Sequence, residues 1–267
     1  MSSEFEVFHF ETQNLKFQIV NSTIKSKYYV LSIISIIFIL SSPSTLMSQH
    51  DPPSQWHHLY VKIRDRLISK EEAQKGLRTL EGRLKEVYSK TEKTEKDDRI
   101  YFPLKGYDFH SIGGKGGSGY QAQGYDFFDG NNHTGHPGHD LFIRDKNQDG
   151  LDDMTGKPVE VLSVSPGMVV SVNFDWKPSS PLRGGNYLWI YEPIKNRYYY
   201  YAHLDEIFVR VGQMVSKGDR LGTVGRTGVK AYLRHSPTHL HFVVHQSMDG
   251  YPKPINPYIE LLRGNRE

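Results

Sequence analysis

From residue 100 onward the chain is a series of short apolar runs that glycine and proline interrupt at regular intervals. The interruptions include Pro166-Gly167 and the triplet Arg183-Gly184-Gly185. Tyrosine (17 residues) and glycine (24 residues) are both abundant, as suits strands joined by tight turns. Short strands at this spacing predict a mainly β fold, built as a sandwich or barrel-like domain. The candidate strands are residues 141–143, 159–164, 168–173, 187–191, 198–203, 220–224 and 239–244.

Residues 55–88, ahead of this β region, show a different spacing of apolar residues. Apolar residues recur there at helical spacing, and Ser69 with Glu72 forms a capping box at a helix start. We therefore expect an N-terminal helical hairpin, or one long broken helix, within residues 49–99, where the charged stretch 91–99 is a linker. This apolar stripe either packs against a partner helix or the next domain, or it belongs to a spacer or a regulatory arm near the groove. Its positions are Trp56, Tyr60, Ile63 and Leu67, then Ala73, Leu77, Leu80, Leu84 and Val87.

Residues 1–48 carry the pattern of an export segment. Lys25-Ser26-Lys27 precedes an apolar run over residues 28–40, and a stretch rich in serine follows. A basic flank, a short apolar core and small residues are typical of a secretory signal peptide. The run is shorter than the ~20 residues of a membrane span, so a cleaved signal is favoured over an uncleaved inner-membrane anchor. Positive charge ahead of the run places the rest of the chain outside the cytoplasm, in the periplasm or the extracellular space.

Charge and cysteine content exclude several classes of protein. A net charge of +3 is too small to indicate a nucleic-acid partner. The absence of cysteine excludes disulfides, a cysteine nucleophile and any cysteine-based zinc site. A zinc site in this chain must therefore use histidine together with aspartate or glutamate. Neither the composition nor the charge predicts an oligomeric state.

Five residues form a pattern that suits such a zinc site. Side chains alternate along an extended strand, so His239 and His241 point the same way, roughly 6–7 Å apart. Far upstream, His136 and Asp140 bracket a Pro-Gly turn, and with His241 they provide three N/O ligands. Three protein ligands with an open fourth position describe a catalytic zinc site, at which a water is activated and a carbonyl polarised. His239 and His203 are left to orient the water, accept its proton or stabilise the oxyanion.

These motifs resemble those of the lysostaphin- and LytM-type zinc metallopeptidases, which cut peptide bonds in bacterial cell-wall peptidoglycan. The resemblance extends from Phe102 to the region of Leu262. It rests on a set of motifs in the family's order: H-x-x-x-D at 136–140, G-K-P-V at 156–159, A-H-L at 202–204, V-G-x-x-V-x-x-G at 211–218, G-x-x-G-x-T-G at 222–228, H-L-H-F at 239–242 and N-P at 256–257.

The resemblance implies that residues 100–267 form the zinc metallopeptidase domain, a curved antiparallel β domain with a groove over the metal. Carried over to this sequence, His136, Asp140 and His241 are the expected zinc ligands. His203 and His239 are the expected catalytic pair. The implied activity is that of an exported endopeptidase, which hydrolyses the peptide cross-links of peptidoglycan with metal-activated water.

An insertion separates the first motif from G-K-P-V, and it allows a second metal hypothesis. Its oxygen donors stand at positions 1, 3, 5 and 9 of a calcium-type loop, with Gly150 at position 6. Position 12 is Gly156 rather than glutamate, and the alternative is a solvated acidic turn. The calcium ligands under this hypothesis are Asp145, Asn147, Asp149 and Asp153.

Four further histidines lie outside the predicted site, and three other functions are alternatives to a cell-wall peptidase. His133, His139, His235 and His245 are expected to be groove or surface residues. One alternative is a non-enzymatic relative that binds the cell wall or activates other hydrolases; such relatives typically lack metal ligands, which are all present here. A second is an exported protease that acts on glycine-rich protein, and a third is a carrier domain, which would need a modified lysine at a hairpin tip.

Overall fold

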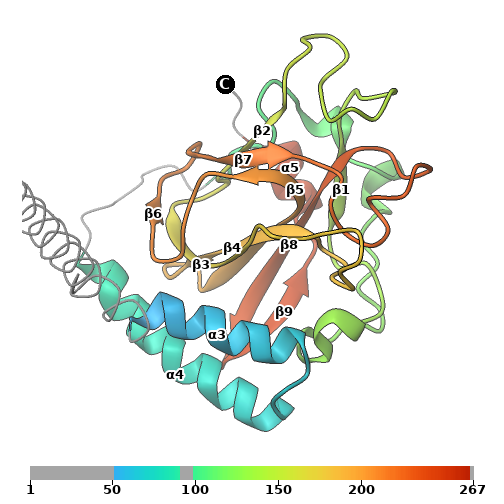
Figure 1. Cartoon of the computed structure of the whole chain (residues 1–267). Helices are drawn as coiled ribbons and strands as arrows, with labels where there is room; N and C mark the ends of the chain where they lie inside the picture. The colour runs from blue at the N-terminus through green and yellow to red at the C-terminus, as the bar shows by residue number, and fades with distance from the viewer. Residues whose placement is uncertain (1–50, 91–98, 265–267) are drawn as a thin grey trace, which may run out of the picture. The chain divides into compact units, whose positions relative to one another are not determined.

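The computed structural model describes residues 51–90 and 99–264 (Figure 1). In that part of the chain a nine-stranded antiparallel sheet follows two long helices. The helices are α3 (Pro52–Arg64), α4 (Lys70–Ser89) and the short α5 (Tyr258–Leu262), with 3-10 turns η1 (Phe109–Ser111), η2 (Lys115–Gly117) and η3 (Phe127–Asn132). The strands are β1 (His139–Phe142), β2 (Glu160–Leu162), β3 (Gly167–Asn173), β4 (Asn186–Glu192), β5 (Arg197–Ile207), β6 (Met214–Val215), β7 (Arg220–Val224), β8 (His239–Met248) and β9 (Tyr251–Ile255).

The sheet is curved because its central strand, β5, changes partner along its length. The main strand order is β1-β8-β5-β4-β3-β6, with β9 beside β8 and β2 beside β7. From Arg197 to Ala202, β5 pairs with β8, and from Leu204 onward it pairs with β7 instead. The residue at the change is His203, whose φ of 64° lies in the left-handed region that non-glycine residues rarely adopt. A bulge of this kind bends the strand and redirects a side chain.

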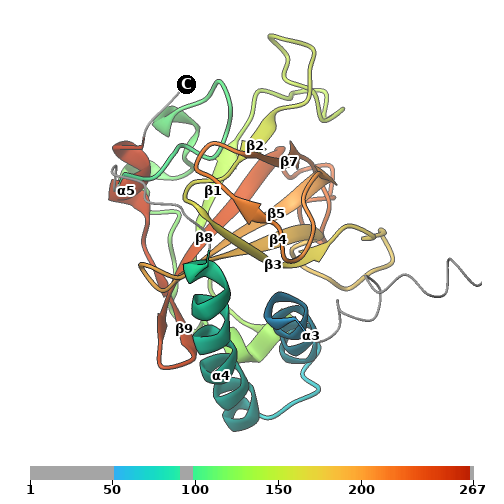
Figure 2. The ribbon, with the colours of Figure 1, turned by 90° about the vertical axis from the view of Figure 1, so that its left-hand side faces the viewer.

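Both faces of the sheet are buried. Leu188 and Phe242 belong to a core on one face. Trp189 belongs to a second core on the opposite face, where α3 and α4 cover the sheet (Figures 1 and 2). The predicted fold, a mainly β antiparallel domain preceded by a helical hairpin, is confirmed.

The helical hairpin forms where the sequence places its start signals. Asp51 caps α3 by accepting a 2.8 Å hydrogen bond from the Ser54 amide, and Pro52 occupies the first turn, where its missing N–H costs nothing. The predicted capping box of α4 is present, since Ser69 and Glu72 exchange their hydrogen bonds. One apolar position was misassigned: α3 ends at Arg64, so Leu67 lies in the connecting turn and is 72% exposed.

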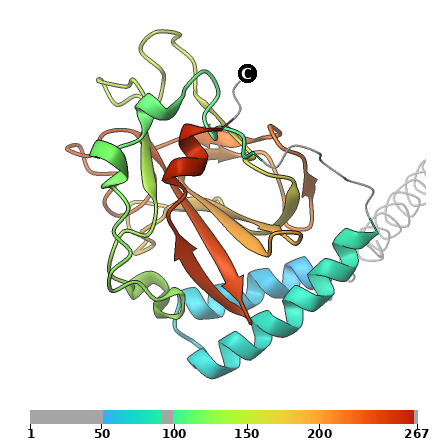
Figure 3. The ribbon, with the colours of Figure 1, turned by 180° about the vertical axis from the view of Figure 1, so that it is seen from behind.

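Polar contacts fix the hairpin to the sheet. Trp56 is fully buried, and its indole N–H donates to the Tyr198 hydroxyl at 3.1 Å. That hydroxyl in turn donates to the carboxylate of Glu81 on α4 at 2.9 Å, and Ser247 of β8 donates to the same oxygen. The β8–β9 turn also rests on α4, as Figure 3 shows from behind. The hairpin and the β domain thus form one compact unit.

We expect Glu81→Gln to stabilise the protein at neutral pH. Burial raises the pKa of Glu81, although the hydroxyls of Ser247 and Tyr198 oppose the shift. The folded state therefore holds the proton more tightly than the unfolded chain does, and stability falls as pH rises from about 4.3 through the raised pKa. Thermal unfolding at pH 4, 5.5 and 7 should show the advantage of Glu81→Gln growing with pH. Glu86→Gln, at an exposed position of α4, is the control, and an advantage that is independent of pH would contradict the expectation.

The predicted strands are present, with small differences at their ends, and two short strands were not predicted. Residues 220–224 match β7 end for end, whereas residues 159–164 shorten to β2. The unpredicted strands are β6, which has two residues, and β9, which contains Pro252 and Pro254. β9 tolerates proline because it lies at an edge and pairs only with β8. In the described ranges no helix has the length and apolarity needed to cross a bilayer, and the predicted export segment, residues 1–48, falls outside them.

Candidate metal centre and catalytic site

The five predicted site residues come from three strands and one turn, and the sheet brings them together. β1 pairs with β8 in a register that puts Asp140 directly opposite His241, so both side chains project from the same face. His136 lies in the turn before β1, and His239 begins β8. His203 reaches the same place from the partner change in β5, where its ring centroid is 4.9 Å from that of His239.

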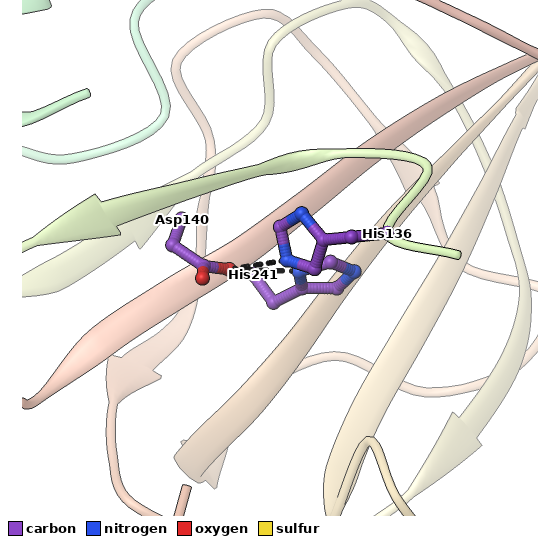
Figure 4. Close-up of side chains that lie close together, drawn as sticks. All are labelled: His136, Asp140 and His241. Atoms are coloured by element: carbon purple, nitrogen blue, oxygen red, sulfur yellow. Dashed lines mark hydrogen bonds and ion pairs between the residues drawn. The ribbon is translucent and has the colours of Figure 1, made fainter. Parts of the chain in front are cut away.

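Three of these residues form a compact cluster. Asp140 Oδ1 lies 3.1 Å from His136 Nε2 and 2.9 Å from His241 Nδ1, and Figure 4 shows the two rings next to each other with the carboxylate beside both. One ligand atom from each residue lies within 4.8 Å of the other two. Among residues 51–90 and 99–264, this is the one group of three His, Asp or Glu side chains close enough to hold a metal ion.

Backbone carbonyls fix the ring orientation of three histidines. Nδ1 lies 2.8 Å from Gly119 O in His136, 2.7 Å from Thr227 O in His203 and 2.7 Å from Pro237 O in His239. A carbonyl oxygen can only accept, so each Nδ1 carries the hydrogen and each neutral ring keeps its lone pair on Nε2. The Nε2 atoms face the cluster: His136 Nε2 lies 3.1 Å from Asp140 Oδ1, to which it donates while it carries a proton, and His239 Nε2 lies 3.7 Å from the same oxygen. Second hydrogen bonds of this kind orient metal-binding and catalytic imidazoles.

The electrostatics favour an ionised Asp140 and neutral rings at His203 and His241, whereas the hydrogen bond with Asp140 raises the pKa of His136, so a metal ion binding there competes with a proton. Burial alone would raise the pKa of Asp140, but hydrogen bonds from His136 and His241 outweigh burial and hold that pKa well below its usual range. Burial lowers the pKa of His241. Burial, together with the neighbouring His239 and His241, lowers the pKa of His203 to about 3. An ionised carboxylate beside neutral imidazoles is the state in which such ligands bind metal.

Glycines make room for the left-handed backbone at His203. The amide of His203 donates to Gly184 O at 2.9 Å, and its carbonyl accepts from Gly225 N at 2.9 Å. A Cβ on Gly228 would stand 2.4 Å from Arg183 O and 2.9 Å from His203 Nδ1. No side chain larger than hydrogen therefore fits at Gly228. The surrounding backbone holds His203 at positive φ, a conformation that costs of order 1–3 kcal/mol for a non-glycine residue.

The cluster fits a zinc ion on the chemistry of its donors. Two imidazole nitrogens and one carboxylate oxygen are a known three-ligand set for catalytic zinc, and the chain has no cysteine to compete with them. A pocket of about 230 Å³ opens over the cluster and is lined by Asp140, His203, His239 and His241. No residue of α3 or α4 lines it, so the hairpin leaves the space over the ligands accessible.

The structure gives no support to the calcium hypothesis. The Asp145 carboxylate is buried and already accepts hydrogen bonds from the amides of Asp149 and Gly150 and from the Thr238 hydroxyl. The Asp153 carboxylate accepts from the Lys146 amide. Asn147 donates to Asp149 at 2.8 Å. These oxygens therefore stabilise the turn through its own amides, as in a solvated acidic turn.

Of the four histidines expected at the groove or the surface, two are buried, and one arginine of the site was not predicted. His139 and His245 are buried; His139 contacts Asn256 at 2.9 Å and His245 contacts the Tyr125 hydroxyl at 2.8 Å. His139 faces away from Asp140, as the alternation predicts, but its face of the sheet is also covered. Arg183 lines the pocket over the cluster. Its sequence signal was a turn triplet, Arg183-Gly184-Gly185, which gives no indication of chemistry.

Comparison with known proteins agrees with this geometry. Residues 146–257 match Peptidase family M23, so this part of the chain is similar to the peptidases of that family. The matched range includes His203, His239 and His241 but begins after His136 and Asp140, whose placement rests on the structure. No curated protein matches the sequence.

Several solved structures are similar to this chain. A zinc-containing peptidase from Vibrio cholerae is 23% identical with a TM-score of 0.39, covering 64% of this chain and 41% of its own. The catalytic domain of lysostaphin from Staphylococcus simulans is 27% identical with a TM-score of 0.35, covering 49% of this chain and 83% of its own. A putative glycyl-glycine endopeptidase LytM from Ruminococcus gnavus is 24% identical with a TM-score of 0.42, covering 80% of this chain and 82% of its own.

Proposed function

We propose that this protein is an exported zinc-dependent endopeptidase that hydrolyses peptide cross-links in bacterial peptidoglycan. The observation that carries the proposal is the cluster of His136, Asp140 and His241, with His203 and His239 beside it, in an M23-type domain. The basic residues and apolar run within residues 25–40 support export. The filled ligand positions favour an enzyme over a non-enzymatic wall-binding relative.

Each residue has a role that follows from its position. His136, Asp140 and His241 would hold the ion, which when bound lowers the pKa of a water and polarises the scissile carbonyl. We assign His239 to accept the proton of the attacking water, because its Nε2 lies nearest the cluster, 3.7 Å from Asp140 Oδ1. His203 packs on His239 and also directs an Nε2 lone pair into the pocket, so we assign it to orient the water and the substrate carbonyl.

Digestion of cross-linked peptidoglycan tests the proposal directly. The purified full chain, loaded with zinc, is incubated with peptidoglycan, and the released fragments are identified by mass spectrometry. A chelated sample and a His241→Ala variant run alongside. New amino and carboxyl ends that vanish in both controls are the expected result, and their masses identify the bond that is cut. A protein that binds no zinc and releases no fragment would contradict the proposed peptidase function and favour a role in binding the cell wall or activating other hydrolases.

Export has its own test. We expect fusion of residues 1–48 to a reporter that is active only outside the cytoplasm to give activity in a Gram-negative host. Replacing Lys25 and Lys27 with glutamate removes the positive flank and should reduce it. Equal reporter activity with and without the segment would argue against export without bearing on the peptidase chemistry.

We expect His203→Gln to slow catalysis strongly while leaving zinc in place. Glutamine retains bulk and polarity but cannot present an imidazole Nε2 to the pocket, and general acid–base groups typically contribute about 10²–10⁴-fold in rate. The measurements are kcat on a defined peptide and zinc per chain after dialysis. His235→Gln, at an exposed position, is the matched control. Loss of zinc together with activity would instead place His203 among the ligands.

A further inference from the structure

Two cations line the pocket over the candidate metal ligands. They are Arg183, in the loop between β3 and β4, and Lys230, in the loop between β7 and β8. Among the described residues of that lining the one carboxylate is Asp140, which His136 and His241 already engage. The pocket therefore offers positive charge to a group that enters it, besides the charge of any metal ion.

The backbone of Arg183 is fixed on both sides. Its amide donates to the side-chain oxygen of Asn131 at 2.9 Å, and the same asparagine donates to the Pro181 carbonyl at 2.9 Å. The next residue, Gly184, accepts a 2.9 Å hydrogen bond from the amide of His203. The loop that carries Arg183 is thus attached both to η3 and to the strand that presents a candidate catalytic histidine.

The guanidinium of Arg183 is held in place as well. One of its nitrogens donates to the backbone carbonyl of His133, just ahead of the turn that carries His136. In the described part of the chain no carboxylate pairs with Arg183, although a guanidinium carries several N–H donors. Its charge also acts on the cluster: a hydrogen bond with Asp140 raises the pKa of His136, and burial and the charge of Arg183 oppose that rise.

Lys230 lacks this support. Its side chain is exposed, and no hydrogen bond or ion pair fixes its ammonium within residues 51–90 and 99–264. An ammonium on a flexible four-carbon stem adds charge to the pocket without a fixed donor direction. Fixed donors stabilise charge that develops during a reaction most strongly, because they need no rearrangement as the reaction proceeds. Of the two cations, Arg183 is the one that meets this condition.

We propose that Arg183 is a catalytic residue, which stabilises the negative charge that develops on the oxygen of the scissile carbonyl. The inference rests on the proposed peptidase function and adds a residue to its mechanism. As the water oxygen bonds to the carbonyl carbon, an electron pair of the C=O bond moves onto the carbonyl oxygen, and Arg183 donates an N–H to that oxygen. When the C=O bond re-forms, the C–N bond breaks. The amine takes the proton that His239 accepted from the water, and the other product keeps the remaining O–H as a carboxylic acid.

Two other roles of Arg183 would give different measurements. If Arg183 bound the substrate equally well before and during the reaction, its loss would raise KM and leave kcat unchanged. If it only fixed the turn before His136, its loss would weaken zinc binding together with activity. A contact that is made in the transition state alone lowers kcat and kcat/KM equally. Kinetics combined with zinc content therefore separate the three roles.

Kinetics of the zinc-loaded full chain test the proposal on a peptide that the peptidoglycan digest shows to be cut. Arg183→Gln should lower kcat and kcat/KM by about 10²–10³-fold, the usual cost of removing one donor to such an oxygen, while KM and zinc per chain stay unchanged. Arg183→Lys keeps the charge but not the planar fork, so it should recover part of the loss. A raised KM with unchanged kcat, or loss of zinc together with activity, would overturn the proposal.

Two further variants that remove one positive charge are the matched controls. Lys230→Gln removes it from the same pocket, and Arg210→Gln removes it at an exposed site outside the pocket. If general attraction by positive charge explained the effect, Lys230→Gln would lower kcat as much as Arg183→Gln does. We expect Lys230→Gln to lower kcat far less and Arg210→Gln to leave it unchanged. Equal losses at Arg183 and Lys230 would contradict the assignment to Arg183.

A tetrahedral anion tests the same contact without turnover. Inorganic phosphate is titrated into the zinc-loaded full chain and into zinc-loaded Arg183→Gln, and Kd is measured by calorimetry. Because hydrogen bonds to charged groups are the stronger ones, Kd should rise by about tenfold or more in Arg183→Gln and should not change in Arg210→Gln. If no peptide is cleaved at all, the proposed function fails, and this titration still decides the role of Arg183: equal Kd values with and without the guanidinium would overturn it.

Discussion

Replacing Asp140 with asparagine is expected to abolish zinc binding and peptidase activity together. Asp140 Oδ1 is the shared partner of His136 and His241, and it is the one formal negative charge in the cluster. Asparagine keeps the shape and removes the charge. Changing a residue that only orients a ligand costs 10–100-fold in metal affinity or activity, so removing the ligand charge itself should cost at least about 100-fold. Zinc per chain after dialysis and the rate on a defined peptide measure the two losses.

The variant must be shown to fold before its inactivity is interpreted. The pKa of Asp140 is lowered in the folded protein, so its carboxylate stabilises the metal-free protein above the unfolded value of about 3.9, and this stability is lost as pH falls below it. Asp140→Asn should therefore unfold at a somewhat lower temperature at neutral pH while retaining its folded spectrum. Asp205→Asn, at an exposed position, is the matched control. An Asp140→Asn protein that retains one zinc and full activity would refute the assignment.

The parts of the fold that could be predicted from the sequence follow local rules. The capping box at Ser69 and the apolar period of α4 depend only on neighbours a few residues away, and both are present. Strand alternation predicts His239 and His241 on one face, and the structure agrees, because both rings lie beside Asp140 Oδ1. The family resemblance supplied the long-range part of the prediction, namely that residues 101 positions apart would meet.

The errors arise where a residue's environment depends on a distant segment. The sequence predicts His139 and His245 at the groove or the surface because polar side chains usually mark an exposed face, but both faces of this sheet are covered, and both residues are buried. The local sequence gives no indication that Tyr125 would reach His245 across 120 positions. The side chain of His203 points into the site because its backbone is left-handed where β5 changes its pairing from β8 to β7. That change exists only in the assembled sheet. Arg183 reaches the pocket over the cluster in the same way, from a loop whose path the assembled sheet determines.

Trp56→Ala is expected to destabilise the whole unit of hairpin and sheet. Trp56 is fully buried, its ring stacks on Tyr60 and Tyr198, and its indole N–H donates to the Tyr198 hydroxyl. Truncating a buried tryptophan typically costs about 3–5 kcal/mol, through lost burial and the cavity that remains. For a unit of this size each kcal/mol lowers Tm by roughly 2–4 °C, so we expect a loss of roughly 6–20 °C in thermal unfolding.

Trp56 also anchors the helix whose later turns carry Tyr60 and Arg64 onto the sheet, where the Tyr60 ring lies edge-on to Tyr187 and Arg64 donates to the Tyr187 hydroxyl. The loss should therefore extend to the whole hairpin rather than to one side chain. Leu67→Ala removes an apolar side chain of the same segment that is 72% exposed, and it should leave Tm unchanged. A Trp56→Ala protein with unchanged Tm would show that the hairpin does not depend on this contact.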